Sequence, residues 1–245
     1  TAIPADYATT LAVVFNQLGD MKQEEISWPD STEGVGVFLS DSAMFQRAAP
    51  CFDVETTRDD VDDPRRPKRR EIHNFTAFYA LTLPLLKRGI PLKIAQLDNI
   101  ARTAEYLDRF KVLILSYEFL KPSTPGLHLA LANWVARGGS LVYVGADIDP
   151  FKEVREWWNR GASDYGAPSE HLFESLGLGR NPRQGIHKYG TGTVIVARKH
   201  PAYFARSAER AAEFTGKVEA AIEAAGLRYI ERNSLQVRRG PYVVA

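Results

Sequence analysis

The sequence predicts an α/β protein of three layers (α/β/α), in which helices cover both faces of a mostly parallel sheet. Short apolar runs bounded by glycine or proline, which are typical of buried strands, alternate with longer segments whose apolar residues recur every three or four positions, as in helices. The connections between these segments are short. Strand–helix–strand units with short connections pair their strands in parallel through right-handed crossovers.

The composition fits a large globular unit and excludes several classes of partner. The chain has 245 residues, of which 44% are hydrophobic, enough to bury a large core. Its 31 basic and 30 acidic residues nearly cancel, so we expect neither nucleic acid nor a membrane surface as a partner. No apolar run is long enough for a membrane helix, no secretory leader is recognisable, and Cys51 is the single cysteine. We therefore expect a cytoplasmic protein.

The N-terminal part predicts a helix, a first strand and a charged loop. Residues 5–20 place five large apolar side chains on one helical stripe: Tyr7, Leu11, Val14, Phe15 and Leu18. We assign residues 1–30 to a helical lead-in from a preceding domain and 31–245 to the α/β domain. The first strand is predicted at 35–39, beside Gly34. Residues 55–73 carry six acidic and six basic side chains, which predicts an exposed loop that is mobile or ordered only by a partner.

The middle of the chain has the most regular alternation. Helices are predicted at 74–88, around 100–110 and at 124–137, and strands at 92–95, 111–116 and 140–144. Gly89 is a stop signal for the first of these helices, and Gly138-Gly139 for the third. The segment Lys111-Val-Leu-Ile-Leu-Ser116 is the clearest buried strand, so we expect it inside the sheet.

The C-terminal part predicts a looser order of elements. A short helix is expected to end near Gly177, followed by a strand at 193–197 and one long helix from Pro201 to Gly226. Segments 227–231 and 235–245 are predicted as closing strands. The chain stops in an apolar, β-type run, so we expect that more chain follows in the native protein.

Three segments of this pattern resemble a known family. They are Phe78-Tyr-Ala-Leu-Thr-Leu-Pro-Leu-Leu-Lys-Arg-Gly-Ile-Pro-Leu, Tyr106-Leu-Asp-Arg-Phe-Lys-Val-Leu-Ile-Leu-Ser and Leu131-Ala-Asn-Trp-Val-Ala-Arg-Gly-Gly-Ser-Leu-Val-Tyr-Val-Gly145. Together they resemble the amidotransferase-like domain, often called the trimerisation domain, that follows the catalytic barrel of certain β-galactosidases. The stretch Tyr189-Gly-Thr-Gly-Thr-Val-Ile-Val196 is similar to a glycine-bounded strand of such domains.

The resemblance implies a flavodoxin-like, class I glutamine amidotransferase-like sheet and a non-catalytic role. The chain would be an accessory or oligomerisation domain of a larger glycoside hydrolase, with carbohydrate as a ligand of the enzyme. Its partners would be a barrel upstream that carries the catalytic carboxylates, a β-rich module downstream, and further copies of itself. The alternative is an independent small-molecule hydrolase or ligand-binding domain on a flavodoxin-like fold.

Six residues are candidates for a ligand crevice, because each comes just after a predicted strand, where open parallel sheets bind ligands. They are Ser40, Asp41, Tyr117, Glu118, Asp147 and Asp149. Two of the carboxylates at a suitable separation could act as acid and base in glycoside hydrolysis. The competing interpretation is helix capping, for which aspartate is common at such positions. We therefore name no catalytic residue.

Other motifs carry no chemistry of their own. Cys51 is not in the glycine-flanked elbow that an amidotransferase nucleophile needs. Residues 40–44 lack the glycines of a phosphate loop. The five histidines have no metal-binding spacing and are expected to be surface or partly buried, so we predict no metal and no cofactor. Four aromatic residues are expected to form either a sugar platform or part of the core or a subunit contact: Trp157, Trp158, Tyr165 and Tyr189.

Overall fold

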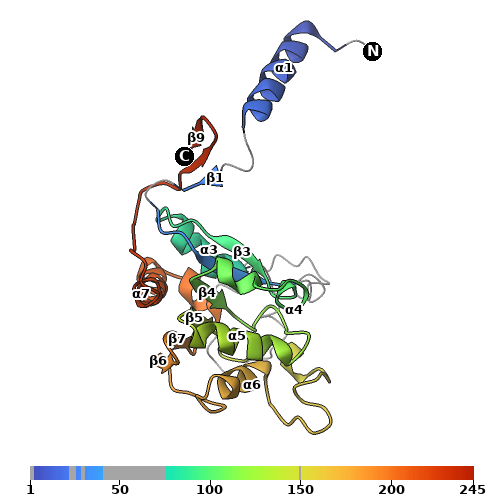
Figure 1. Ribbon diagram of the computed structural model, residues 1–245, viewed down its shortest axis with the longest axis vertical. Coiled ribbons are helices and arrows are strands. Elements are labelled where there is room, and N and C mark those ends of the chain that lie inside the picture. The colour runs from blue at the N-terminus through green and yellow to red at the C-terminus, as the bar shows by residue number, and fades with distance from the viewer. Residues whose placement is uncertain (1–2, 22–25, 29–30, 41–75, 149) are drawn as a thin grey trace.

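A computed structural model of the chain describes residues 3–21, 26–28, 31–40, 76–148 and 150–245 (Figure 1). The α-helices are α1 (Ala5–Asp20), α3 (Thr76–Leu86), α4 (Asn99–Arg102), α5 (Gly126–Ala136), α6 (Pro168–Ser175) and α7 (Ala208–Ala224). The 3₁₀ turns within the described ranges are η3 (Tyr106–Arg109), η4 (Pro150–Glu153) and η5 (Pro201–Ala205). The strands are β1 (Ile26–Ser27), β2 (Val35–Leu39), β3 (Lys93–Gln96), β4 (Val112–Leu115), β5 (Ser140–Val144), β6 (Gly185–Tyr189), β7 (Gly192–Ala197), β8 (Val237–Arg239) and β9 (Tyr242–Val244).

The main sheet has six strands in the order β3-β2-β4-β5-β7-β6. Every neighbouring pair is parallel except β6–β7, which forms an antiparallel hairpin. The five predicted strands are confirmed as members of one mostly parallel sheet. Strand β4 lies inside the sheet and is buried along its whole length, as its apolar sequence predicted.

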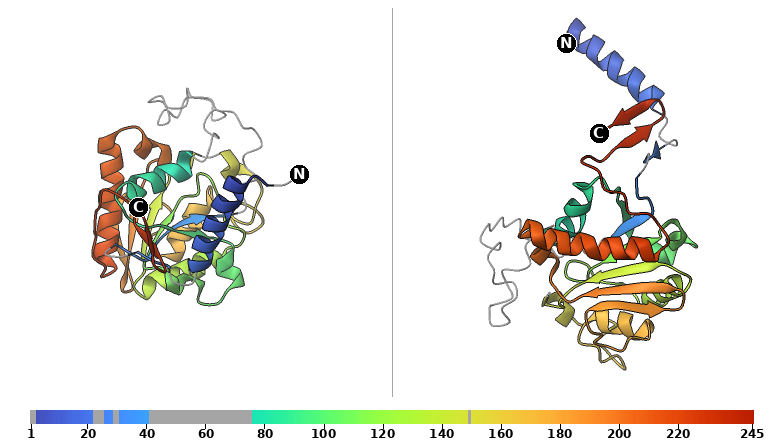
Figure 2. Two further views of the ribbon diagram at one scale, coloured as in Figure 1. Left: turned by 90° about the horizontal axis from the view of Figure 1, so that it is seen from above. Right: turned by 90° about the vertical axis from the view of Figure 1, so that its left-hand side faces the viewer.

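The sheet lies between two layers of helices, which confirms the three-layer α/β/α class (Figure 2). From β2 the chain crosses through α3 to β3 on one side, whereas from β4 it crosses through α5 to β5 on the other side. Crossovers between parallel strands are right-handed as a rule, which places α3 and α5 on opposite faces. Helix α7 packs beside α3 and against β5 and β7, and α6 packs beside α5. The core fills both interfaces of the sheet with the helices.

Two predicted helices are shorter than expected. The helix expected around 100–110 is the short α4 followed by η3, because Thr103 is extended and Glu105 has a positive φ of 59°. The helix expected from Pro201 to Gly226 is also divided, into η5 and α7. Ser207 separates them, because its side chain accepts a hydrogen bond from the backbone N–H of Arg210 (3.3 Å) and so starts a new helix.

The closing strands are also placed differently from the prediction. Residues 227–231 form no strand, and the hairpin of β8 and β9 joins β1 in a separate three-stranded sheet. This small sheet connects the C-terminal hairpin to the predicted lead-in, since Ile26 pairs with Arg239. Strand β6 was not predicted, because its sequence Gly-Ile-His-Lys-Tyr is exposed or half-buried along the edge of the sheet.

Helix α1 projects away from the three-layer body, and the β8–β9 hairpin lies between them (Figures 1 and 2). None of its 16 residues is buried. The charged segment 55–73 and Cys51 lie outside the described residues. Among the helices of the described ranges, none is both long and apolar enough to cross a membrane.

Candidate functional site

The candidate site lies where the order of the strands reverses. Successive connections leave β2 and β4 in opposite directions along the sheet, so the carboxyl ends of these two strands flank the switch point at which open α/β sheets bind ligands. The structure places Ser40 after β2, and Tyr117 and Glu118 after β4, as the sequence predicted. All three side chains are buried. Asp41 and Asp149 lie outside the described residues.

Glu118 holds the loop that follows β5. Its Oε1 atom accepts hydrogen bonds from the backbone N–H groups of Ala146 (2.6 Å) and Ile148 (3.4 Å). A carboxylate that accepts two backbone N–H bonds replaces the ladder hydrogen bonds that this irregular segment lacks. The contacts of Glu118 therefore agree with a structural role.

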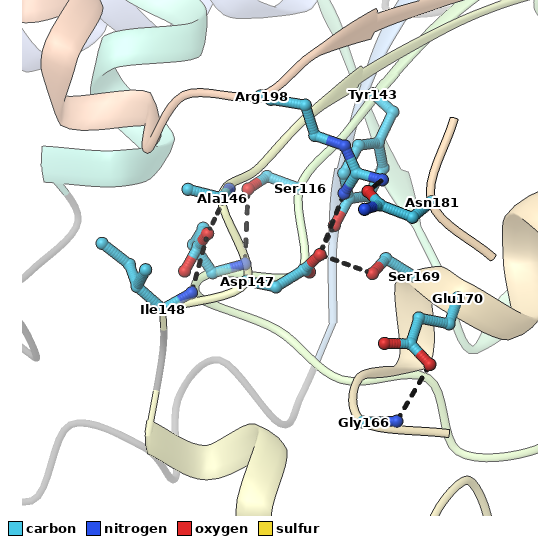
Figure 3. A network of polar contacts seen from close by, with 11 residues as sticks. Ser116, Tyr143, Ala146, Asp147, Ile148, Gly166, Ser169, Glu170, Asn181 and Arg198 are labelled. Carbon is cyan, nitrogen blue, oxygen red and sulfur yellow. Dashed lines mark hydrogen bonds and ion pairs between the residues drawn. The ribbon is translucent and has the colours of Figure 1, made fainter. Parts of the chain in front are cut away.

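Asp147 is the centre of a second polar network (Figure 3). Its Oδ1 atom accepts a hydrogen bond from the Tyr143 hydroxyl (3.0 Å), and its Oδ2 atom accepts one from Ser169 Oγ (2.8 Å). Arg198 Nη1 donates to the same Oδ2 (3.1 Å) in an ion pair that is about one-fifth exposed on either side. These bonds join the end of β5 to α6 and to the residue after β7.

The network also explains the backbone at Asp147. Its φ is +56°, a region that costs a non-glycine residue free energy and that aspartate tolerates better than most. Burial, and then the negative charge of Asp147, raises the pKa of the Tyr143 hydroxyl, which therefore stays protonated and donates. Both oxygens of Asp147 are engaged with protein groups, so this carboxylate is not arranged as a general base.

A third network was not foreseen from the sequence. The Tyr117 hydroxyl lies 2.6 Å from His128 Nε2, and His128 Nδ1 lies 2.8 Å from His171 Nδ1. His128 comes from α5 and is fully buried, which shows that the expectation of a surface or partly buried histidine was wrong at this position. The sequence pattern could have indicated this burial, because His128 shares the apolar face of α5 with Leu131 and Val135.

The protonation states of Tyr117, His128 and His171 follow from the burial of His128. Burial, and then the neighbouring His171, lowers the pKa of His128 to about 3, so its imidazole is neutral near pH 7. The buried Tyr117 hydroxyl finds its acceptor, within the described part of the chain, in His128 Nε2. His128 then carries its hydrogen on Nδ1 and donates it to His171 Nδ1. Consequently His171 is the Nε2–H tautomer.

His171 belongs to the wall of a pocket of about 450 Å³ between the β5–α6 loop and α6. We call it the α6 pocket. Besides Pro125 and Ala162, it is lined by aromatic, charged and hydroxyl side chains: Trp157, Ser163, Asp164, Tyr165, His171 and Arg180. The four aromatic residues considered together from the sequence are divided by the structure. Trp157 and Tyr165 lie on this pocket, whereas Trp158 is buried and Tyr189 packs against the core from β6.

In the ranges that the structure describes, no group of three or more histidine, cysteine, aspartate or glutamate side chains is arranged to hold a metal ion. Comparisons of the sequence with protein-family models and with curated proteins found no match. The assignment of this chain thus depends on its fold and on the chemistry of its surfaces.

Proposed function

We propose that this chain is a non-catalytic accessory and assembly domain of a larger glycoside hydrolase, related to the trimerisation domains of β-galactosidases. The observation that carries the proposal is the apolar stripe of α1. Its five large side chains are between 40% and 67% exposed: Tyr7, Leu11, Val14, Phe15 and Leu18. A soluble protein rarely leaves such a continuous apolar face uncovered, and a patch of this kind is typical of an interface.

The candidate crevice supports a scaffold role in a second way. Glu118 and Asp147 are the two described carboxylates among the candidates, and both hold backbone or side-chain groups of the fold. A glycosidase needs one carboxyl group free to protonate the leaving group and another to act as base or nucleophile. We infer that the chemistry of the enzyme resides in another domain of the parent protein, and that α1 packs on that domain or on a second copy of the chain.

Sedimentation velocity on the chain and on two variants tests the assembly role. We expect association that grows with protein concentration and that Phe15→Lys abolishes, because the substitution places a charge in the middle of the stripe. Thr9→Lys is the matched control, since Thr9 lies on the other side of α1, about 175° from the centre of the stripe by helical periodicity. A chain that stays monomeric, or association that Phe15→Lys leaves unchanged, would argue against assembly through α1.

Activity assays address the catalytic alternative. We expect no hydrolysis of nitrophenyl β-galactoside or of glutamine by the chain. Turnover that disappears in Glu118→Gln would instead establish an enzyme of its own and refute the accessory role.

A further inference from the structure

The α6 pocket has rigid aromatic walls. The Trp157 indole N–H donates to the Pro122 carbonyl oxygen (2.8 Å), and its ring packs edge-on against His128 and His171, at centroid distances of 5.4 and 5.1 Å. The Tyr165 hydroxyl donates to Glu174 Oε2 (2.5 Å), and its ring packs edge-on against His171 at a centroid distance of 5.1 Å. These contacts fix both rings before any ligand arrives, which reduces the entropy lost on binding.

The polar groups of the pocket are also oriented. His171 Nδ1 is occupied by His128, so the Nε2–H group is the one that can donate to a ligand. Arg180 is held by Asp164 (2.9 Å) and lies 4.5 Å above the Tyr165 ring. Asp164 and Arg180 both remain partly open to solvent, so a carboxylate acceptor and guanidinium donors stand next to each other.

The charge of the pocket selects among ligand classes. Arg180 of the lining pairs with Asp164 of the lining and with Glu174 (3.6 Å), which lies beside the pocket but not in its wall, so the guanidinium charge is already balanced by two carboxylates. An anionic ligand such as a phosphate would therefore have to compete with these carboxylates for Arg180, which disfavours it. A purely apolar ligand would have to strip water from charged groups without replacing their hydrogen bonds. A neutral ring compound with many hydroxyl groups carries no negative charge and can replace the lost hydrogen bonds to water, because it offers donors and acceptors at its edge and C–H bonds on its face.

We propose that the α6 pocket binds a neutral saccharide of one or two rings, with Trp157 against the face of a sugar and with Asp164, Arg180 and His171 on its hydroxyl groups. The volume of about 450 Å³ falls in the range of small-ligand sites. This site lies on the three-layer body and is separate from the α1 stripe. Sugar binding and assembly are therefore independent properties that can fail independently.

Isothermal titration calorimetry on the chain with D-glucose, D-galactose, cellobiose and lactose tests the site. We expect saturable binding of at least one of these sugars with a Kd on the order of 1 mM, which is usual for a small ligand in an exposed pocket. Glucose 6-phosphate should bind no more tightly than glucose. Absence of saturable binding by all four sugars, or tighter binding of the phosphate, overturns the proposal.

Variants then locate the bound sugar. We expect Trp157→Ala to weaken binding by about tenfold, and His171→Phe, which keeps a ring but lacks the N–H donor, by about fivefold. Ala162 is an exposed pocket residue, so Ala162→Arg fills the pocket without removing a packed side chain. This variant tests whether the sugar binds in the pocket even if Trp157→Ala does not fold. Tyr79→Ala, on an exposed aromatic of α3, is the control and should leave the Kd within about twofold. Binding that survives Ala162→Arg refutes this location.

Discussion

The buried histidine of α5 should make the protein sensitive to mild acid. The pKa of His128 is lowered from 6.5 to about 3 in the folded protein. In the unfolded chain the same side chain takes up a proton near pH 6.5. Between these two values the unfolded state holds more protons than the folded state, so the free energy of unfolding falls as the pH is lowered.

The size of the effect follows from the shift. At pH 5 the solution is about 1.5 pH units below the pKa of the histidine in the unfolded chain, so that histidine is protonated. Each pH unit below this pKa corresponds to about 1.4 kcal/mol. His128 alone should therefore lower the free energy of unfolding by about 2 kcal/mol between pH 7.5 and pH 5. Burial also lowers the pKa of the neighbouring His171, which adds a loss of the same sign. The total change for the wild-type protein should therefore exceed the contribution of His128.

Urea denaturation at pH 7.5 and pH 5.0, followed by tryptophan fluorescence, isolates this contribution. We expect His128→Gln to be less stable than wild type at pH 7.5, because it disturbs the chain from Tyr117 to His171, but to lose about 2 kcal/mol less between the two pH values. His187→Gln, a substitution on the edge strand β6, controls for the loss of a histidine. Equal pH dependence in wild type and His128→Gln would refute the neutral, buried assignment of His128.

Four further substitutions test the packing and the polar networks. Asp147→Ala should lower the free energy of unfolding by about 3 kcal/mol, because it leaves Arg198 without its carboxylate partner. A loss below about 1 kcal/mol in urea denaturation would show that the ion pair contributes little to stability. Gly192→Ala should prevent stable folding, since its Cβ would lie 1.9 Å from the Val135 carbonyl oxygen, whereas Gly216→Ala in α7 meets no atom within 4 Å and should stabilise by about 0.5–1 kcal/mol. Melting temperatures by circular dichroism distinguish the two, and equal effects would contradict the close approach at Gly192. Ser207→Ala should cost about 1 kcal/mol by removing the cap of α7, measured by the same thermal melts, and an unchanged Tm would argue against that cap.

The sequence determined the fold class through local patterns. Strands at 35–39, 111–116 and 140–144 could be predicted because each is buried on both faces and so forms an unbroken apolar run. Helix α5 could be predicted because its buried residues recur at helical spacing and glycines follow it. Strand β6 and the break between η5 and α7 were missed, since a half-exposed edge strand has no such run and one serine carries the cap.

The arrangement of side chains at the site was decided by the tertiary structure. His128 and His171 are 43 positions apart and meet only because α5 and α6 pack on the same face of the sheet. Asp147 was a candidate from its position after a strand, but its role depends on Ser169 and Arg198, which reach it from later elements. Hydrophobic periodicity records which residues are buried, because burial imposes a pattern on each strand and helix separately. Hydrogen bonds between distant side chains impose no local pattern, so only the folded chain reveals them.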